Sequence, residues 1–229
     1  MISQQLAGML KTVASALGDD IRREVVFVGG CTIALFITDT FTLQSIRSTQ
    51  DVDLICDLAG YADWNRLQAS LKERGFTIPM GEGVICRMHY GPLIVDFMPD
   101  DERILGFSNR WYRRGIETAQ EHTLDDGQVI RILTPPMFLC TKLEAWKGRG
   151  AGDLFTSKDA EDIINIVDGR EELLSELQTE PAEVRSYVAE EIHALLNHPY
   201  FYDFLDGMIR TFERADVVRR RFEALAKLD

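Results

Sequence analysis

The sequence lacks the features of membrane-spanning, secreted and disulfide-bonded chains. No stretch of its 229 residues approaches the roughly 20 consecutive apolar residues that a membrane helix needs, so we expect no membrane partner. The first residues have neither a basic start nor a long apolar run before a small-residue cleavage site, which predicts a cytoplasmic protein without a signal peptide. The 4 cysteines are scattered and form no C-x-x-C pair, which predicts reduced, mostly buried thiols.

The chain also has few basic residues and few histidines. Lys and Arg number 25 against 37 Asp and Glu, which gives a formal net charge of −12 at pH 7. A protein that coats long nucleic acid is usually basic, because phosphate neutralisation drives that binding. The 4 histidines form no cluster with each other or with cysteine, so we expect no zinc site. With 45% hydrophobic and 27% charged residues, the composition is that of a globular protein with a real core.

The pattern of apolar residues divides the chain into two regions. The first region predicts helices at 2–17, 32–37 and 61–74, strands at 25–28, 51–58, 84–90 and 93–98, and a hairpin over 122–133. After Thr134-Pro135-Pro136 only helices are predicted, at about 136–148, 158–168, 170–178, 181–197 and 200–227. We therefore predict an α+β fold, with a mixed sheet flanked by helices in a domain over residues 1–134 and a helical C-terminal domain over 135–229.

Three aspartates in the first region form the candidate site. Asp51 and Asp53 belong to the only D-x-D of the chain and lie on one face of a predicted strand, because side chains at i and i+2 point the same way. If the strand that carries Asp96 lies alongside, three carboxylates converge. Carboxylates packed so closely repel one another unless a cation lies among them. Hard oxygen ligands with open positions suit Mg²⁺, which is usually bound through few carboxylates plus substrate phosphates.

A glycine pair, Gly29-Gly30, ends the strand that precedes these aspartates. A turn without side chains lets backbone N–H groups approach phosphate oxygens, and a helix behind it offers its N-terminal end. Two metal ions about 4 Å apart would activate the attacking oxygen and stabilise the leaving one. The glycines and the carboxylates together predict a site for nucleotidyl transfer from a nucleoside triphosphate. The alternative is a plain glycine turn beside aspartates that face solvent.

These motifs resemble a known superfamily. Val28-Gly29-Gly30, the run RSTQDVDL over 47–54 and Val95-Asp96 look like the signature of the polymerase-β-like nucleotidyltransferases. Two later stretches, TKLEAWKGR over 141–149 and SKDAEDI over 157–163, are similar to the AbiEii/MenT-like toxins of type IV toxin–antitoxin systems. The resemblance covers about residues 25–167. The gap from Gly30 to Asp51 is longer than in the compact members of the superfamily and is typical of the AbiEii-like branch.

The resemblance implies roles for individual residues. Asp51 and Asp53 would bind Mg²⁺, or Mn²⁺ in its place, and Asp96 would complete the metal site and accept the acceptor's proton. Lys142 would contact the triphosphate, and Asp159 would match an acidic position of the second domain that is needed for activity. The other nucleotide contacts that the resemblance implies are Gly29, Gly30, Arg47, Ser48 and Lys158.

The residues themselves leave alternatives open. Lys142 is either available to a phosphate or an ordinary surface lysine at a helix edge. Arg47 either reaches a phosphate or pairs with an aspartate, and Lys158-Asp159 could equally be a charge pair in the first turn of a helix. The basic-aromatic cluster over 110–114 either stacks a base or consists of a partly buried tryptophan with solvated arginines.

The sequence thus predicts a Mg²⁺-dependent nucleotidyltransferase that moves a nucleoside monophosphate onto an acceptor and releases pyrophosphate. In the toxin-like branch the implied acceptor is RNA, tRNA in particular, and a cognate antitoxin would be a partner. Two alternatives stay open. One is a nucleotidyltransferase that modifies a small antibiotic of the aminoglycoside or lincosamide type. The other is a non-catalytic member of the fold that binds nucleotide or a partner protein, against which the complete set of carboxylates argues.

Overall fold

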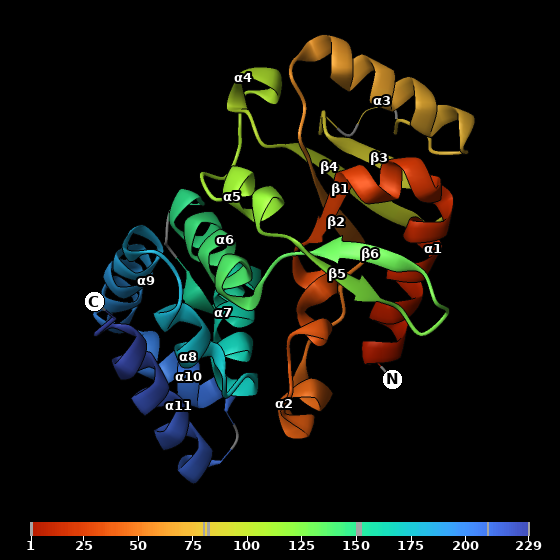
Figure 1. Cartoon of the computed structure of the whole chain (residues 1–229). Coiled ribbons are helices and arrows are strands. Elements are labelled where there is room, and N and C mark those ends of the chain that lie inside the picture. The colour runs from red at the N-terminus through yellow and green to blue at the C-terminus, as the bar shows by residue number, and fades with distance from the viewer. Residues whose placement is uncertain (1, 80, 82, 150–152, 210, 229) are drawn as a thin grey trace. The chain divides into compact units, whose positions relative to one another are not determined.

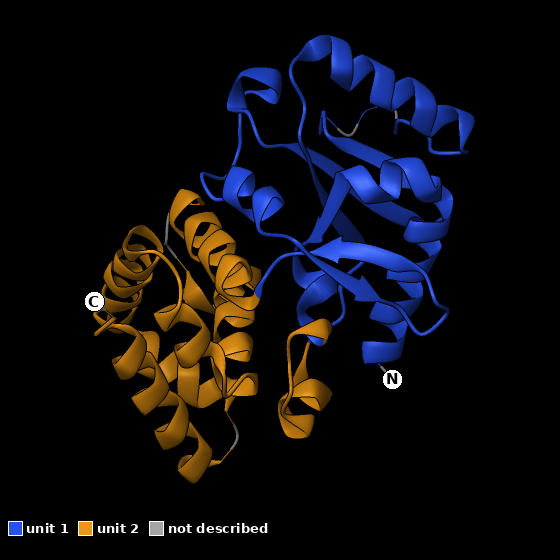
Figure 2. Ribbon diagram, in the orientation of Figure 1, with its two compact units in different colours: residues 1–34, 47–134 blue, residues 35–46, 135–229 orange. Residues whose placement is uncertain are grey.

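The computed structural model (Figure 1) describes residues 2–79, 81, 83–149, 153–209 and 211–228. The chain forms two compact units, coloured blue and orange in Figure 2. Unit 1 consists of residues 1–34 and 47–134, and unit 2 of residues 35–46 and 135–229. The predicted fold class, a mixed sheet flanked by helices and followed by a helical C-terminal region, is confirmed.

Unit 1 is built on a six-stranded mixed sheet with the order β3-β4-β2-β1-β6-β5. Its strands are β1 (Val25–Val28), β2 (Asp51–Cys56), β3 (Arg87–Tyr90), β4 (Leu93–Pro99), β5 (Gln120–Thr123) and β6 (Val129–Ile132). β2 runs parallel to β4 and β1 parallel to β6, whereas the β1–β2, β3–β4 and β5–β6 pairs are antiparallel. The helices of this part of the chain are α1 (Ile2–Glu24), the 3-10 helix η1 (Gly30–Leu35), α3 (Tyr61–Glu73), α4 (Glu102–Leu105) and α5 (Tyr112–Glu117).

Helix α5 covers part of one face of this sheet. The hydroxyl of Tyr112 donates a hydrogen bond to Sδ of Met98 on β4 at 3.3 Å. Gly115 lies so close to the sheet that a Cβ there would be 3.6 Å from the side chain of Ile55 on β2. Ile55 and Met98 are paired in register on neighbouring parallel strands, so their side chains share a face. The candidate site described below lies on this same face of the sheet.

Unit 2 is helical. Its elements are α2 (Thr40–Ser45), α6 (Pro135–Gly148), the 3-10 helix η2 (Leu154–Thr156), α7 (Lys158–Gly169), α8 (Leu173–Gln178), α9 (Ala182–Leu196), α10 (Phe201–Met208) and α11 (Phe212–Leu225). Nearly every residue of α7 is buried, including the polar Asp159, Asp162, Asn165 and Asp168, so α7 is the central helix of the unit. A central helix must pair its charged side chains within the protein, because burial of an unpaired charge is costly.

The segment 35–46 packs on α7 although the sequence analysis placed it in the first domain. The backbone N–H groups of Thr38 and Asp39 donate to the carbonyl of Gly169 at 2.9 and 3.0 Å. The hydroxyl of Thr42 donates to the carboxylate of Asp168 at 2.6 Å. A Cβ at Gly169 would lie 2.7 Å from the side chain of Ile37, so the approach requires glycine. These bonds join residues more than 120 positions apart, and no local pattern announces them.

Several elements differ from the sequence prediction: α1 continues to Glu24, the helices α2, α4 and α5 were not predicted, and three further elements differ in type or length. The helix predicted over 32–37 is the 3-10 helix η1, whose start is tightened by Thr32, since its N–H and its hydroxyl both donate to the carbonyl of Gly29. The strand predicted over 84–90 begins only at Arg87. The helix predicted over 200–227 is two helices, because Ile209 and Thr211 adopt extended backbone between α10 and α11.

Two predicted absences can be compared with the described residues. All 4 cysteines are buried and free, as their spacing predicted. Among the helices of the described ranges, none combines the length and the apolar character that crossing a bilayer requires.

Candidate active site

The three aspartates of the candidate site lie on one face of the sheet of unit 1. β2 and β4 are parallel and paired so that Asp53 stands beside Asp96. Side chains paired in register project to the same face, and Asp51, two residues earlier on β2, shares it. This is also the face of Ile55 and Met98, which α5 covers further along the strands. We call Asp51, Asp53 and Asp96, with the arginine described below, the aspartate face.

Gly29 makes room for one of these carboxylates. It follows the last residue of β1 with φ of +74°, a left-handed conformation that favours glycine. Because β1 pairs with β2 so that Val28 stands opposite Asp53, the turn lies directly at the carboxylate. A Cβ at Gly29 would lie 2.7 Å from Cγ and 2.9 Å from Cβ of Asp53. The sequence analysis assigned the missing side chain to phosphate approach; the structure shows that Asp53 itself occupies the space.

The residues before β2 lie in an irregular stretch. The guanidinium of half-buried Arg47 donates a long hydrogen bond of 3.5 Å to the carbonyl of Ser48, and Ser48 is exposed. The hydroxyl of Thr49 donates to Oδ1 of Asp51. Arg47 and Ser48, which the sequence analysis predicted to bind the nucleotide, therefore lie in the chain segment that leads directly into Asp51.

An arginine that the sequence analysis missed joins the third aspartate. Arg87 on β3 is paired in register with Asp96, and its Nε and Nη2 donate to the two carboxylate oxygens at 2.9 and 2.8 Å. Such a bidentate pair is among the strongest hydrogen-bonded ion pairs in proteins. Burial, followed by the charge of Asp96, raises the pKa of the neighbouring Cys86 thiol to about 11. This pair could have been predicted from the turn at Gly91. Once Tyr90 is paired with Leu93, moving three residues away from the turn along each strand brings Arg87 opposite Asp96.

The aspartate face does not gather three carboxylates around one point. Across the described ranges no group of three or more His, Cys, Asp or Glu side chains is arranged to hold a metal ion. Both oxygens of Asp96 accept hydrogen bonds from Arg87. Asp51 and Asp53 are half-buried, and two carboxylates fit Mg²⁺, because it takes its remaining ligands from substrate phosphates and water. The residues present therefore suit a cation held by Asp51 and Asp53 together with a phosphate substrate.

The predicted residues of the helical region meet in unit 2. Nζ of Lys142 on α6 lies 2.6 Å from a carboxylate oxygen of Asp162 and 3.2 Å from one of Asp159, both on α7. The guanidinium of Arg149 also pairs with Asp159. Lys142, Asp159 and Asp162 are buried, so Lys142 is not the exposed helix-edge lysine that the sequence allowed. We call these four residues the α6–α7 cluster.

The sequence analysis missed Asp162, whereas Lys158 and Asp159 follow the pattern of a helix start. Asp159 and Asp162 are three residues apart and therefore neighbours on one side of a helix, which was the available signal. Lys158 is the first residue of α7 and is exposed. Asp159 lies in the first turn, where the helix dipole favours an acidic residue, but its partners are Lys142 and Arg149.

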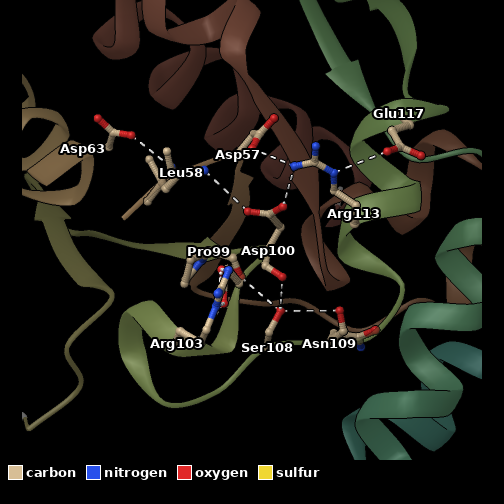
Figure 3. A network of polar contacts seen from close by, with 12 residues as sticks. Asp57, Leu58, Asp63, Pro99, Asp100, Arg103, Ser108, Asn109, Arg113 and Glu117 are labelled. Atoms are coloured by element: carbon tan, nitrogen blue, oxygen red, sulfur yellow. Dashed lines mark hydrogen bonds and ion pairs between the residues drawn. The ribbon is translucent and has the colours of Figure 1, made fainter. Parts of the chain in front are cut away.

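The basic-aromatic cluster over 110–114 is tied into unit 1. Trp111 is only 3% exposed, and the guanidinium of Arg110 lies over its ring at 5.1 Å. Arg113 donates to Asp57 at 2.9 Å and to Asp100 at 3.0 Å (Figure 3). The hydrogen bond that Arg113 donates to Asp100, with the charge of Asp57, raises the pKa of Arg113. The structure matches the alternative of a buried tryptophan, because a buried ring does not offer a face for a base.

Comparisons with known proteins add a structural likeness. No family model matches the chain, and no curated protein sequence matches it. Among solved structures, the chain is similar to the solution structure of the antibiotic-resistance factor ANT(2'')-Ia, with a TM-score of 0.43 and 12% sequence identity over 98% of this chain and 94% of that chain. A likeness of this degree concerns general architecture and assigns neither activity nor substrate, since one fold carries many functions.

Proposed function

We propose that the protein is a divalent-metal-dependent nucleotidyltransferase, which transfers a nucleoside monophosphate from a nucleoside triphosphate to an acceptor. The observation that carries the proposal is the pairing of Asp53 with Asp96 on neighbouring strands, with Asp51 on the same face and the Gly29 turn packed against Asp53. Two carboxylates two residues apart on the same face of β2 are suited to a cation that brings phosphates with it. The resemblance of the motifs to polymerase-β-like nucleotidyltransferases supports the same reaction.

The residues of the aspartate face have separate parts in this reaction. Asp51 and Asp53 would hold the cation, which would neutralise the triphosphate and activate the attacking oxygen. Arg87 fixes the direction of the Asp96 carboxylate. Each carboxylate oxygen has a second lone pair, so Asp96 can accept the acceptor's proton while Arg87 holds it. The acceptor oxygen bonds to the α-phosphorus, the bond to the bridging oxygen breaks, and pyrophosphate leaves with that electron pair.

We propose RNA, and tRNA in particular, as the acceptor, and a toxin-like role with a cognate antitoxin as partner. The support is the similarity of residues 141–149 and 157–163 to the AbiEii/MenT-like toxins. Those two stretches also supply every member of the α6–α7 cluster, in which Lys142, Asp159 and Asp162 are buried and Arg149 is exposed. A small antibiotic is the competing acceptor.

A labelling experiment tests the activity and the acceptor together. The protein is incubated with Mg²⁺ and each α-labelled nucleoside triphosphate, with total RNA in one arm and an aminoglycoside or a lincosamide in the others. We expect label on RNA, reduced roughly a hundredfold or more in Asp53→Asn. Asp57→Asn is the matched control, because Asp57 follows the other end of β2 and pairs with Arg113. Label on an antibiotic would overturn RNA as the acceptor. The absence of label in every arm would overturn the proposed nucleotidyltransferase activity.

A thermal-shift measurement separates the enzyme from a non-catalytic relative. A ligand that binds only the folded state stabilises it by about 2.7 kcal/mol when present at a hundred times its dissociation constant. We expect Mg²⁺ with a nucleoside triphosphate to raise the melting temperature of the wild type and not that of Asp53→Asn. A shift without any labelling would favour a non-catalytic nucleotide-binding protein. Equal shifts in the wild type and in Asp53→Asn would contradict the aspartate face as the site.

A further inference from the structure

The two carboxylates that hold Lys142 are unequal. Asp162 is 1% exposed and lies 2.6 Å from Nζ of Lys142. Asp159 lies at 3.2 Å and also pairs with Arg149, whose side chain is 73% exposed. One carboxylate is therefore the closer and deeper partner of the lysine, and the other is shared with a cation at the surface.

We propose that Asp162 is a positioning residue, which fixes the direction in which Lys142 presents its ammonium group. The proposal rests on the proposed function in that Lys142 is expected to contact the triphosphate. A lysine ends in three rotatable donors on a flexible four-carbon stem, so a single charged partner leaves its direction poorly defined. Two carboxylates on successive turns of α7 define it.

The difference in burial decides which carboxylate keeps this role when an anion approaches. A triphosphate competes for the cations of the α6–α7 cluster, and it meets Arg149 first because that guanidinium is the exposed member. Asp159 is then the partner whose pairing changes. Asp162 is out of reach of solvent and keeps Lys142 in place during the exchange. A buried ammonium that lost both carboxylates would carry a large desolvation cost.

The first test measures the reactivity of Lys142 itself, without any need for catalysis. The full-length protein is treated with a small amine-acylating reagent, and the modification of Lys142 is followed by mass spectrometry of its peptide. We expect slow labelling in the wild type and severalfold faster labelling in Asp162→Asn. Asp168→Asn is the matched control, since Asp168 is also buried on α7 but bonds Thr42 and Arg214 instead. Equal labelling of Lys142 in Asp162→Asn and in the control would overturn the proposal.

The second test separates positioning from a purely structural role by kinetics. We expect kcat of Asp162→Asn to fall roughly 10- to 100-fold, the range for a misplaced group, with a smaller change in KM for the nucleotide. Asp168→Asn is expected to keep its kcat per folded molecule. If Asp162→Asn does not fold, Asp162→Glu keeps the charge but moves the carboxylate by one methylene, and we expect its Lys142 to label faster than that of the wild type. Labelling of Lys142 in Asp162→Glu at the rate of Asp168→Asn would overturn the proposal.

The two tests fail independently. Absence of nucleotidyl transfer in the wild type would contradict the proposed function, and the labelling rates would still decide the role of Asp162. Unchanged kcat in a folded Asp162→Asn variant, with transfer intact in the wild type, would contradict the positioning role while leaving the activity in place.

Discussion

The aspartate face of unit 1 and the α6–α7 cluster of unit 2 use the same side chains in opposite ways. The aspartate face places three carboxylates on one face of neighbouring strands, where Asp96 pairs with Arg87 and Asp51 accepts a hydrogen bond from Thr49. The α6–α7 cluster sets two carboxylates against one ammonium and one guanidinium, which balance. We propose that a cation joins the aspartate face together with its phosphate substrate, whereas the balanced α6–α7 cluster already pairs its charges internally.

This contrast predicts where each substitution is felt. Removing the carboxylate of Asp51 or Asp53, which are only half-buried, should reduce activity and cation binding more than stability. Removing one member of the α6–α7 cluster leaves a buried charge uncompensated, so the loss should appear in the free energy of unfolding. The following variants would break or sharpen the comparison.

Lys142→Met should have the largest effect on stability. It leaves two buried carboxylates with Arg149 alone, and breaking a buried pair by removing one partner costs about 3–5 kcal/mol. Lys147→Met is the control on the same helix, because Lys147 is exposed and its pair with Glu191 is worth about 1 kcal/mol or less. Urea denaturation of both variants measures the difference, and equal losses would contradict the balanced-cluster interpretation.

Gly29→Ala should act mainly on activity. The new Cβ would displace the Asp53 side chain, and a non-glycine residue at this φ adds roughly 1–3 kcal/mol of backbone strain. Gly91→Ala has a comparable φ of +57° but open space around its Cβ, so it should carry strain without displacing a carboxylate. Transfer assays on both proteins, normalised to folded protein, make the comparison. Full activity in Gly29→Ala would mean that the transfer reaction does not depend on the observed position of the Asp53 side chain.

Asp39→Asn should have the smallest effect, and one that depends on pH. Burial raises the pKa of Asp39, but the N–H of Thr42 and the guanidinium of Arg214 outweigh it and lower this pKa from 3.8 to about 2. A lowered pKa stabilises the fold above the unfolded value, and the gain is lost as pH falls through about 2. Because the side chain is 38% exposed, we expect only about 1 kcal/mol after solvent screening.

The asparagine of this variant can still cap α2, so only the charge is removed. Unfolding free energies of wild type and Asp39→Asn should therefore differ near pH 6 and converge toward pH 2. A difference that stays constant over this range would show that the carboxylate contributes through its shape alone.

The sequence predicted the strands of the site because those features are local, whereas the predicted convergence of Asp51, Asp53 and Asp96 on one metal ion is not what the described residues show. A run of four apolar residues before a glycine pair predicted β1, and the alternation of Asp51, Asp53 and Ile55 predicted which side chains share a face. The placement of Asp96 beside Asp53 was a hypothesis about strand order, and the register of β2 and β4 bears out that pairing. The Arg87 pair required the register of the neighbouring hairpin as well.

The packing of α7 could not be predicted in this way. Its polar groups have partners in three different stretches of the chain. Asp162 pairs with Lys142 on α6, the carbonyl of Gly169 accepts from the segment 35–46, and Asp168 bonds both Thr42 in that segment and Arg214 on α11. The periodicity of apolar residues predicts that α7 is a helix. It does not predict that the polar side of the helix is buried as well. Contacts at such separations depend on the whole fold, and this is why the segment 35–46 was assigned to the first domain.

The path of the chain through the two units has a practical consequence for anyone who dissects the protein. Since residues 35–46 belong with the helices, no single cleavage can yield both units whole. A fragment beginning at residue 135 would leave the Gly169 carbonyl without its two amide donors and Arg214 without Asp39 and Thr42. Excising the helical half intact would require a circularly permuted or bridged gene, in which a short linker carries 35–46 across to the segment that starts with α6.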